Sequence, residues 1–102
     1  MSNQFPGVLR RGDANTGVSL LQYYLDFLSV YYDSIPSIAV DGIFGSATES
    51  AVSVIQTLLG LPATGAVGPL TWEGMARLAA DVEASSRSAE GQYPGYVLSE
   101  EA

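Results

Sequence analysis

The sequence contains no cysteine, no histidine and no lysine. The lack of cysteine excludes a disulfide scaffold, a thiolate zinc site and a cysteine nucleophile. It leaves the compartment open, because a cysteine-free domain folds equally well inside or outside the cell. The lack of histidine excludes a Ser-His-Asp arrangement, the usual zinc hydrolase ligand sets and histidine-dependent pH switching. The acid–base chemistry that remains is that of carboxylate pairs, so we expect neither a metal nor a cofactor.

Positive charge is also scarce, with four arginines against 11 acidic residues and a net charge of −7. Such a surface repels nucleic acid and anionic lipid, and no segment approaches the length needed to cross a bilayer. We therefore expect no nucleic-acid partner and no membrane partner. The N-terminus lacks a basic and apolar signal, so an export signal would lie outside this chain.

Apolar residues make up 47% of the 102 positions, which is enough for one small core without metal or disulfide support. Helical spacing predicts three helices, which run from about Thr16 to Tyr32, from Ser46 to Leu59, and from Pro69 to about Ser85–Ser88. Gly60 and Pro62 should end the second helix. The expected fold is an all-α three-helix bundle with short connecting loops. Residues 1–88 should form the module and residues 89–102 a tail.

The predicted core comes from one side of each helix. Its members are Val18, Leu21, Leu25, Leu28 and Tyr32 on the first helix, widened by Tyr24, Phe27 and Tyr31; Ala51, Val52, Ile55, Leu58 and Leu59 on the second; and Trp72, Met75, Ala76, Ala79 and Val82 on the third.

A first internal repeat, V-x-x-[LI]-Q-x-x-L, occurs at residues 18–25 and 52–59 with an offset of 34. Its glutamines, Gln22 and Gln56, stand beside core positions, where a buried amide must find hydrogen-bond partners. We expect each glutamine to hold the backbone of a neighbouring loop. A ligand role is the alternative.

A second repeat, G-x-[FV]-G-x-x-T, precedes the second and third helices, and an acidic residue matches more loosely after it. Its members are Gly42, Phe44, Gly45 and Thr48, and then Gly65, Val67, Gly68 and Thr71. Because proline favours the first helical position, Pro69 makes Gly68 the N-cap of its helix, and Gly45 follows by analogy. Thr48 would then reach back to open backbone donors. The competing assignment makes Ser46 the cap and Glu49 the acid of a capping box.

The rest of this loop is also explained mainly by architecture. Gly42 and Gly45 should adopt positive φ or allow close backbone approach. Phe44 between them should fill the core, and Asp41 should accept hydrogen bonds from the backbone of its own turn.

A third similarity joins the two ends of the chain. The stretch QFPG-VL at residues 4–9 resembles QYPGYVL at residues 92–98, at an offset of 88 through the glycine and with Tyr96 opposite the gap. We interpret the second stretch as the opening of another copy of the module, so that the natural protein would be a tandem array. Chance similarity between two Pro-Gly turns is the alternative.

In order and spacing, the glutamine helix, "DGIFGSATESAVSVIQTLLGL" and "TGAVGPLTW", which ends on Trp72, resemble the peptidoglycan-binding domain 1 family. The resemblance covers about Leu9 to Met75. It implies a three-helix module that binds bacterial cell wall without cutting it, often as tandem copies or beside a lytic domain. The implied location is extracytoplasmic or at the cell wall, with a phage lysin that acts from the cytoplasm as the other possibility.

For ligand contact we expect a shallow groove at the loop before the second helix, with Asp41, Ser46 and Thr48 as its polar residues. Tyrosines suit sugars and peptides because they offer flat area and a polar tip. The candidates are Tyr23, Tyr24 and Tyr31, together with Tyr32, as far as each stays exposed. Arg10 and Arg11 could meet a stem-peptide carboxylate.

Two other functions remain open from the sequence. A structural spacer or protein-interaction module could share the fold and bind no glycan. A glycosidase would need a carboxylate pair drawn from Asp33, Asp41, Glu49 and Glu73. Since these residues lie mostly at helix starts and turns, where structural roles explain them, we expect a binding module and not an enzyme.

Overall fold

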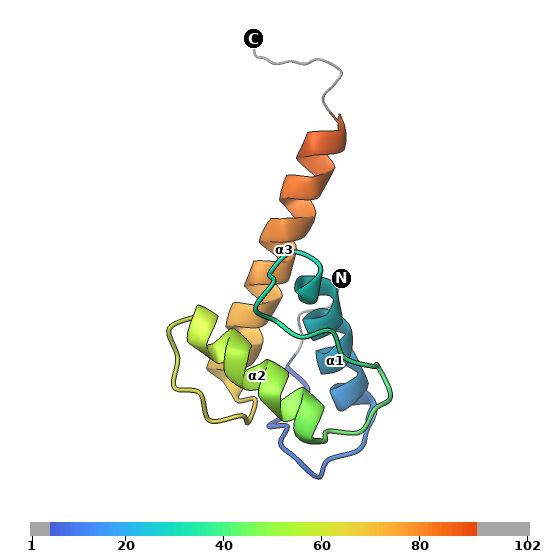
Figure 1. Cartoon of the computed structure of the whole chain (residues 1–102), viewed down its shortest axis with the longest axis vertical. Helices are drawn as coiled ribbons and strands as arrows, with labels where there is room; N and C mark the ends of the chain where they lie inside the picture. The colour runs from blue at the N-terminus through green and yellow to red at the C-terminus, as the bar shows by residue number, and fades with distance from the viewer. Residues whose placement is uncertain (1–4, 92–102) are drawn as a thin grey trace.

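Three helices account for most of the chain in the computed structural model, which describes residues 5–91 and the side chains of residues 5–85. They are α1 (Thr16–Ser29), α2 (Ser46–Leu58) and α3 (Pro69–Gly91) (Figure 1). Within that range there is no strand, and the extended segments form two isolated bridges. The prediction of an all-α three-helix fold is confirmed. The stretch at residues 92–98 that carries the third repeat lies outside the described residues.

Helix α1 begins at the predicted residue and ends three residues earlier than predicted. The side chain of Asn15 caps it by accepting a hydrogen bond from the N–H of Val18 at 3.0 Å. After Ser29 the chain tightens into a turn, in which the N–H groups of Tyr31 and Tyr32 both donate to the carbonyl of Leu28.

Helix α2 has the predicted start, and its C-terminus shows why it stops. The N–H of Leu61 donates to the carbonyl of Gln56 and the N–H of Gly60 to that of Thr57. With Gly60 at φ 76°, this pattern is a Schellman motif. Leu58, predicted to face inward, is 44% exposed because it lies on the outer side of the last turn.

The N-terminus of α2 corrects two expectations. Gly45 is the N-cap, as the analogy with Gly68 predicts, but no side chain caps this helix, so neither Thr48 nor Ser46 has the expected capping role. Gly45 has φ −106°, and a Cβ there would meet nothing within 4 Å. The prediction of positive φ is therefore correct for Gly42, at 78°, and wrong for Gly45.

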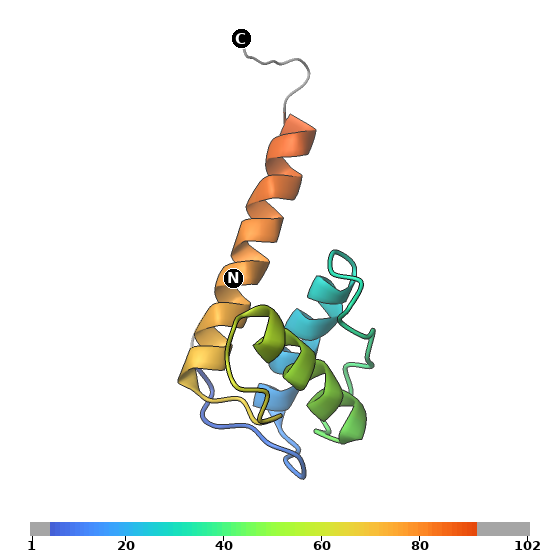
Figure 2. The same ribbon diagram turned by 60° about the vertical axis from the view of Figure 1, so that its left-hand side comes forward.

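Helix α3 starts at Pro69 as predicted and runs to Gly91, past the predicted end near Ser85–Ser88. Serines weaken a helix only slightly, whereas Gly91 is a strong stop signal. The C-terminal half of α3 projects beyond the other two helices in both views (Figures 1 and 2).

The core lies where α1 packs against both other helices. Tyr24 meets Trp72 edge to face, with ring centroids 5.5 Å apart, and Phe44 is 1% exposed, as predicted. The other buried apolar residues are Leu9, Val18, Leu21, Leu25, Leu28, Ile35, Ala51, Val52, Ile55, Val67, Met75, Ala76 and Ala79.

The segment before α1 ties together the loops that precede α2 and α3. Leu9 and Val67 exchange two backbone hydrogen bonds of 3.1 and 2.7 Å. Further along, Phe44 donates to the carbonyl of Asp13 and accepts from the N–H of Gly12, each at 2.9 Å. The two loops of the second repeat are thus fixed side by side at one end of the molecule.

Candidate functional site

Gln22 holds the loop before α2 from inside the molecule. The side chain is 1% exposed. Its Oε1 accepts hydrogen bonds from the N–H groups of Asp41 and Gly42, at 3.0 and 2.8 Å. Its Nε2 lies within 3.0 Å of three acceptors, the Asp41 carboxylate, the Ile43 carbonyl and the Thr48 hydroxyl. Both the oxygen and the nitrogen of the amide therefore have hydrogen-bond partners, and the prediction that Gln22 holds a neighbouring loop is confirmed.

Gln56 repeats this arrangement in the loop before α3. Its Oε1 accepts from the N–H of Gly65 at 3.0 Å. Its Nε2 lies within 3.2 Å of the Thr64 hydroxyl, the Ala66 carbonyl and the Thr71 hydroxyl. Thr48 and Thr71 thus have equivalent roles: each hydroxyl accepts a hydrogen bond from a glutamine amide, and neither threonine caps a helix.

We term each glutamine amide with the loop that it binds a glutamine clamp. The same clamp forms before α2 and before α3, although the two connectors differ in length. Gln22 and Asp41 are 19 residues apart, whereas Gln56 and Thr64 are 8 apart. The additional residues extend α1 beyond its glutamine and form the connector at residues 30–40, and they leave the clamped loop unchanged.

Beside each clamp the surface is hollowed, and the two hollows have equivalent linings. The first hollow, of about 240 Å³, is lined by Gln22, Ile38, Ala39, Asp41, Ile43, Gly45, Ser46, Ala47 and Thr48. The second hollow, of about 250 Å³, is lined by Gln56, Leu61, Pro62, Thr64, Ala66, Gly68, Pro69, Leu70 and Thr71. Apart from the glutamines, each residue of the second set follows its counterpart by 23 positions. The internal repeat has therefore produced one concave site twice.

The two hollows differ in charge. The first carries the Asp41 carboxylate, and the second has Thr64 in its place. The N–H of Ile43 and the amide of Gln22 both donate to Asp41 Oδ1 at 3.0 Å, and these bonds hold the pKa of this carboxyl below its usual range. The backbone N–H of Asp41 itself also donates to the carboxylate, and the residue remains exposed to solvent. The first hollow therefore presents an exposed negative charge, which the second hollow lacks at this position.

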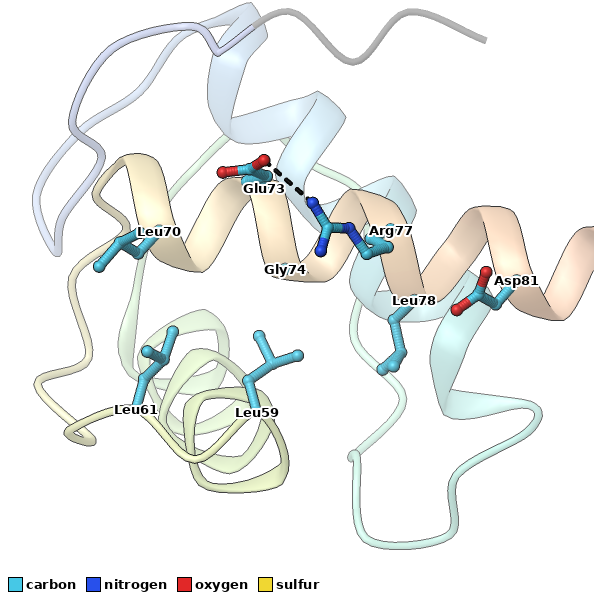
Figure 3. A pocket seen from close by; sticks show the side chains of 8 residues that line it. All are labelled: Leu59, Leu61, Leu70, Glu73, Gly74, Arg77, Leu78 and Asp81. Atoms are coloured by element: carbon cyan, nitrogen blue, oxygen red, sulfur yellow. Dashed lines mark hydrogen bonds and ion pairs between the residues drawn. The ribbon is translucent and has the colours of Figure 1, made fainter.

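A longer groove continues from the second hollow between α2 and α3 (Figure 3). Leu61 and Leu70 line both. The groove has a volume of about 320 Å³, and Glu73 and Arg77 form an ion pair of 3.1 Å along it. The residues that line this groove were not among the candidates predicted from the sequence. Leu70, which follows Pro69 at the start of a predicted helix, was the signal that could have pointed to them.

The structure does not bring the predicted ligand-binding residues together at one site. Asp41 and Ser46 are exposed at the first hollow, while Thr48 is 3% exposed and occupied by Gln22. Tyr24 has no exposed surface and cannot contact a ligand, because its ring is packed on Trp72.

The two exposed tyrosines lie outside the first hollow. Tyr23 is 47% exposed on α1. Tyr31 packs on Phe27 and lines a different hollow with Tyr32 and α3. The two arginines considered for carboxylate binding differ, because the guanidinium of Arg11 has an acidic partner whereas the contact of Arg10 is made by its backbone. Arg11 forms an exposed ion pair with Glu49 at 3.3 Å, and the backbone N–H of Arg10 donates to Asp13.

Three of the four carboxylates considered for catalysis have local partners. Glu49 is paired with Arg11, Glu73 with Arg77, and Asp41 is bound into its turn. Over residues 5–91, no group of three or more acidic side chains is placed to hold a metal ion. In the same range, no helix is long and apolar enough to span a membrane.

Comparison with known proteins gives consistent results. The model of the family described as "Putative peptidoglycan binding domain" matches residues 14–75. The "Uncharacterized protein in bpoA1 3'region" of Kitasatospora aureofaciens is 40% identical over 67 residues, which are 64% of this chain and 52% of that protein. The chain thus spans about half the length of this curated relative. The crystal structure of the SleB N-terminal domain superposes with a TM-score of 0.61 and 32% identity, over 78% of this chain and 97% of that one.

Proposed function

This chain belongs to the peptidoglycan-binding domain family, and from that membership we propose that it binds peptidoglycan through the first hollow without cleaving it. Family membership favours wall binding over the spacer function. The observation that carries the choice of site is the exposed carboxylate of Asp41, at a concave surface that also exposes Ser46.

The chemistry of the first hollow suits this ligand. Peptidoglycan offers hydroxyls, amides and amines, and a carboxylate with a neighbouring hydroxyl can accept hydrogen bonds from all three. The Gln22 clamp holds the loop before any ligand arrives, so little conformational entropy is lost on binding. The proposal also includes Tyr23, which is 47% exposed on α1 outside the hollow, as a flat contact for the ligand.

The role of the whole protein follows from the module. We infer that it anchors or targets an attached domain at the bacterial cell wall, either beside a lytic domain or as one of several copies. A single shallow site binds weakly, and linked copies raise the avidity through effective concentration.

The experiment is co-sedimentation with insoluble peptidoglycan. The molecule itself supplies the control substitution, because Thr64 occupies the position of Asp41 in the second hollow and accepts the equivalent bond from Gln56. Asp41→Thr should therefore keep the loop folded while it removes the charge. We expect the wild type to sediment and Asp41→Thr to bind about fivefold more weakly, the size of an exposed charge contact.

A second variant separates position from net charge. Asp41→Thr combined with Thr64→Asp keeps the composition and moves the carboxylate to the second hollow. This variant should bind as weakly as Asp41→Thr alone. A wild-type chain that stays in the supernatant would contradict wall binding itself, whereas full binding by both variants would contradict only the choice of hollow.

A further inference from the structure

The N-terminal segment at residues 5–9, which we term the arm, is held by three separate contacts. Phe5 packs on Trp72 of α3, with ring centroids 6.4 Å apart. Pro6 lies against Gly17 of α1, where an added Cβ would approach Pro6 Cβ to 3.0 Å. Leu9 is bonded to Val67 through two backbone hydrogen bonds.

The arm also has a specific backbone shape. Gly7, between Pro6 and the bridge at Leu9, has φ 105°, a conformation that side-chain-bearing residues rarely adopt. The arm thus places in succession an aromatic ring on Trp72, a proline against Gly17 and a glycine with positive φ.

The C-terminal stretch repeats these requirements. At the constant offset of 88, Tyr93, Pro94 and Gly95 stand for Phe5, Pro6 and Gly7. Tyr96 then takes the position of Val8, which is 54% exposed and tolerates a larger side chain, and Val97 takes that of Leu9. A hollow of about 520 Å³ beside Phe5 and Trp72 leaves room for the tyrosine hydroxyl.

The C-terminal stretch cannot reach this place in its own chain. Trp72 and Gly91 belong to one continuous helix, and the 19 residues between them correspond to about 28 Å at 1.5 Å per residue. Tyr93 follows Gly91 by two residues, which span about 7 Å at most when fully extended. Figure 1 shows this half of α3 directed away from the arm's position.

We propose that residues 93–97 of one chain dock in the arm site of a second copy, in place of that copy's own arm. This exchange preserves the contacts of the resident arm, and such swaps are a low-cost route to association. The resident arm has the advantage of a millimolar effective concentration, because it belongs to the same chain. Exchange therefore becomes visible when the resident arm is weakened or when the protein is concentrated.

Trp72 is the only tryptophan, so its fluorescence reports directly on the arm site. The test uses the full chain with Phe5→Ala, which removes the resident ring, and a synthetic peptide of residues 92–98. We expect the peptide to produce a saturable change in Trp72 emission. The same peptide with Tyr93→Ala should produce none. A response to neither peptide, or an equal response to both, would overturn the proposal.

Sedimentation of the intact chain provides a measurement that does not depend on the stability of Phe5→Ala. At millimolar concentration the wild type should contain a dimer fraction that Tyr93→Ala lacks, since this substitution leaves the sequence of the resident arm unchanged. A wild type that stays monomeric at this concentration, or a Tyr93→Ala chain that associates equally, contradicts arm exchange.

Discussion

At the scale of single residues, the two glycines of the loop before α2 have different reasons for being there. Gly42 adopts φ 78°, and its Cα faces the hydroxyl of Ser19, which an added Cβ would approach to 3.0 Å. Gly45 has an extended conformation and open space around it. The motif requires the first glycine for backbone geometry and only permits the second.

One substitution made at both glycines distinguishes these roles. Gly42→Ser should lower the free energy of unfolding by about 1–2 kcal/mol, the cost of a side chain in the left-handed region. Gly45→Ser should be neutral or stabilising by a few tenths of a kcal/mol, because serine is a favourable N-cap and this helix has no side-chain cap. Urea denaturation of the two variants measures the difference, and equal losses would contradict it.

At the scale of secondary structure, the sequence allowed the starts of all three helices to be predicted. Gly45 and Pro69 are local signals that depend on a few neighbouring residues, and the start of α1 followed from the onset of the apolar spacing. The ends were harder to predict. Helix α1 stops at Ser29, although the apolar spacing continues to Tyr32, and α3 continues because the three serines at residues 85–88 do not outweigh the helix formers around them.

The candidate site was predictable only in part. The glutamine clamps followed from the need of a buried amide for partners, and Asp41 followed from turn chemistry. The burial of Tyr24 depends on the way α1 rotates toward Trp72, and helical spacing alone does not set that rotation. The equivalence of the two hollows required the three-dimensional arrangement, because their linings combine a helix with a loop that lies 19 or 8 residues away.

Proline substitutions should separate the supported half of α3 from its projecting half. Ala76 is 4% exposed and lies in the core, whereas Ala84 is exposed and follows Ala79, the last buried residue of α3 among the side chains described up to residue 85. Ala84→Pro should end the helix locally and lower the free energy of unfolding by less than about 1 kcal/mol. Ala76→Pro should cost about 3 kcal/mol or more.

Circular dichroism and urea denaturation provide the two measurements. Ala84→Pro should lose helical signal while the denaturation midpoint stays close to that of the wild type. If its midpoint falls as far as that of Ala76→Pro, the projecting half contributes to the fold in a way that the packing does not indicate.

At the scale of the whole molecule, the lack of histidine and cysteine predicts a broad pH range of constant stability. The pKa of Asp41 is lowered by its hydrogen bonds with Ile43 and Gln22, so its stabilising contribution is present above the ordinary value of 3.8 and is lost as the pH falls through the lowered value. The pKa of Tyr24 is raised by burial, and further by Tyr23 and Glu83. Its contribution is therefore present below 10.0 and is lost as the pH rises through the raised value.

Thermal unfolding measured across this range should therefore give a plateau between the two limits, with a decline on the acid side and another on the alkaline side. Asp41→Thr should reduce the fall in melting temperature at acid pH and leave the fall at alkaline pH unchanged. A step in the melting temperature between pH 6 and 7, the region in which histidine titrates, would contradict this account.

The projecting half of α3 also sets an orientation. Each residue of an α-helix turns the chain by about 100° and advances it by about 1.5 Å. Removal of a single residue between Asp81 and Gly91 would therefore swing whatever follows onto a different side of the module, although the two hollows would stay as they are. Removal of a full turn would bring the following segment closer to the module and nearly restore the side from which that segment leaves. Through α3 the module thus controls the direction in which the next segment leaves it, as well as the distance.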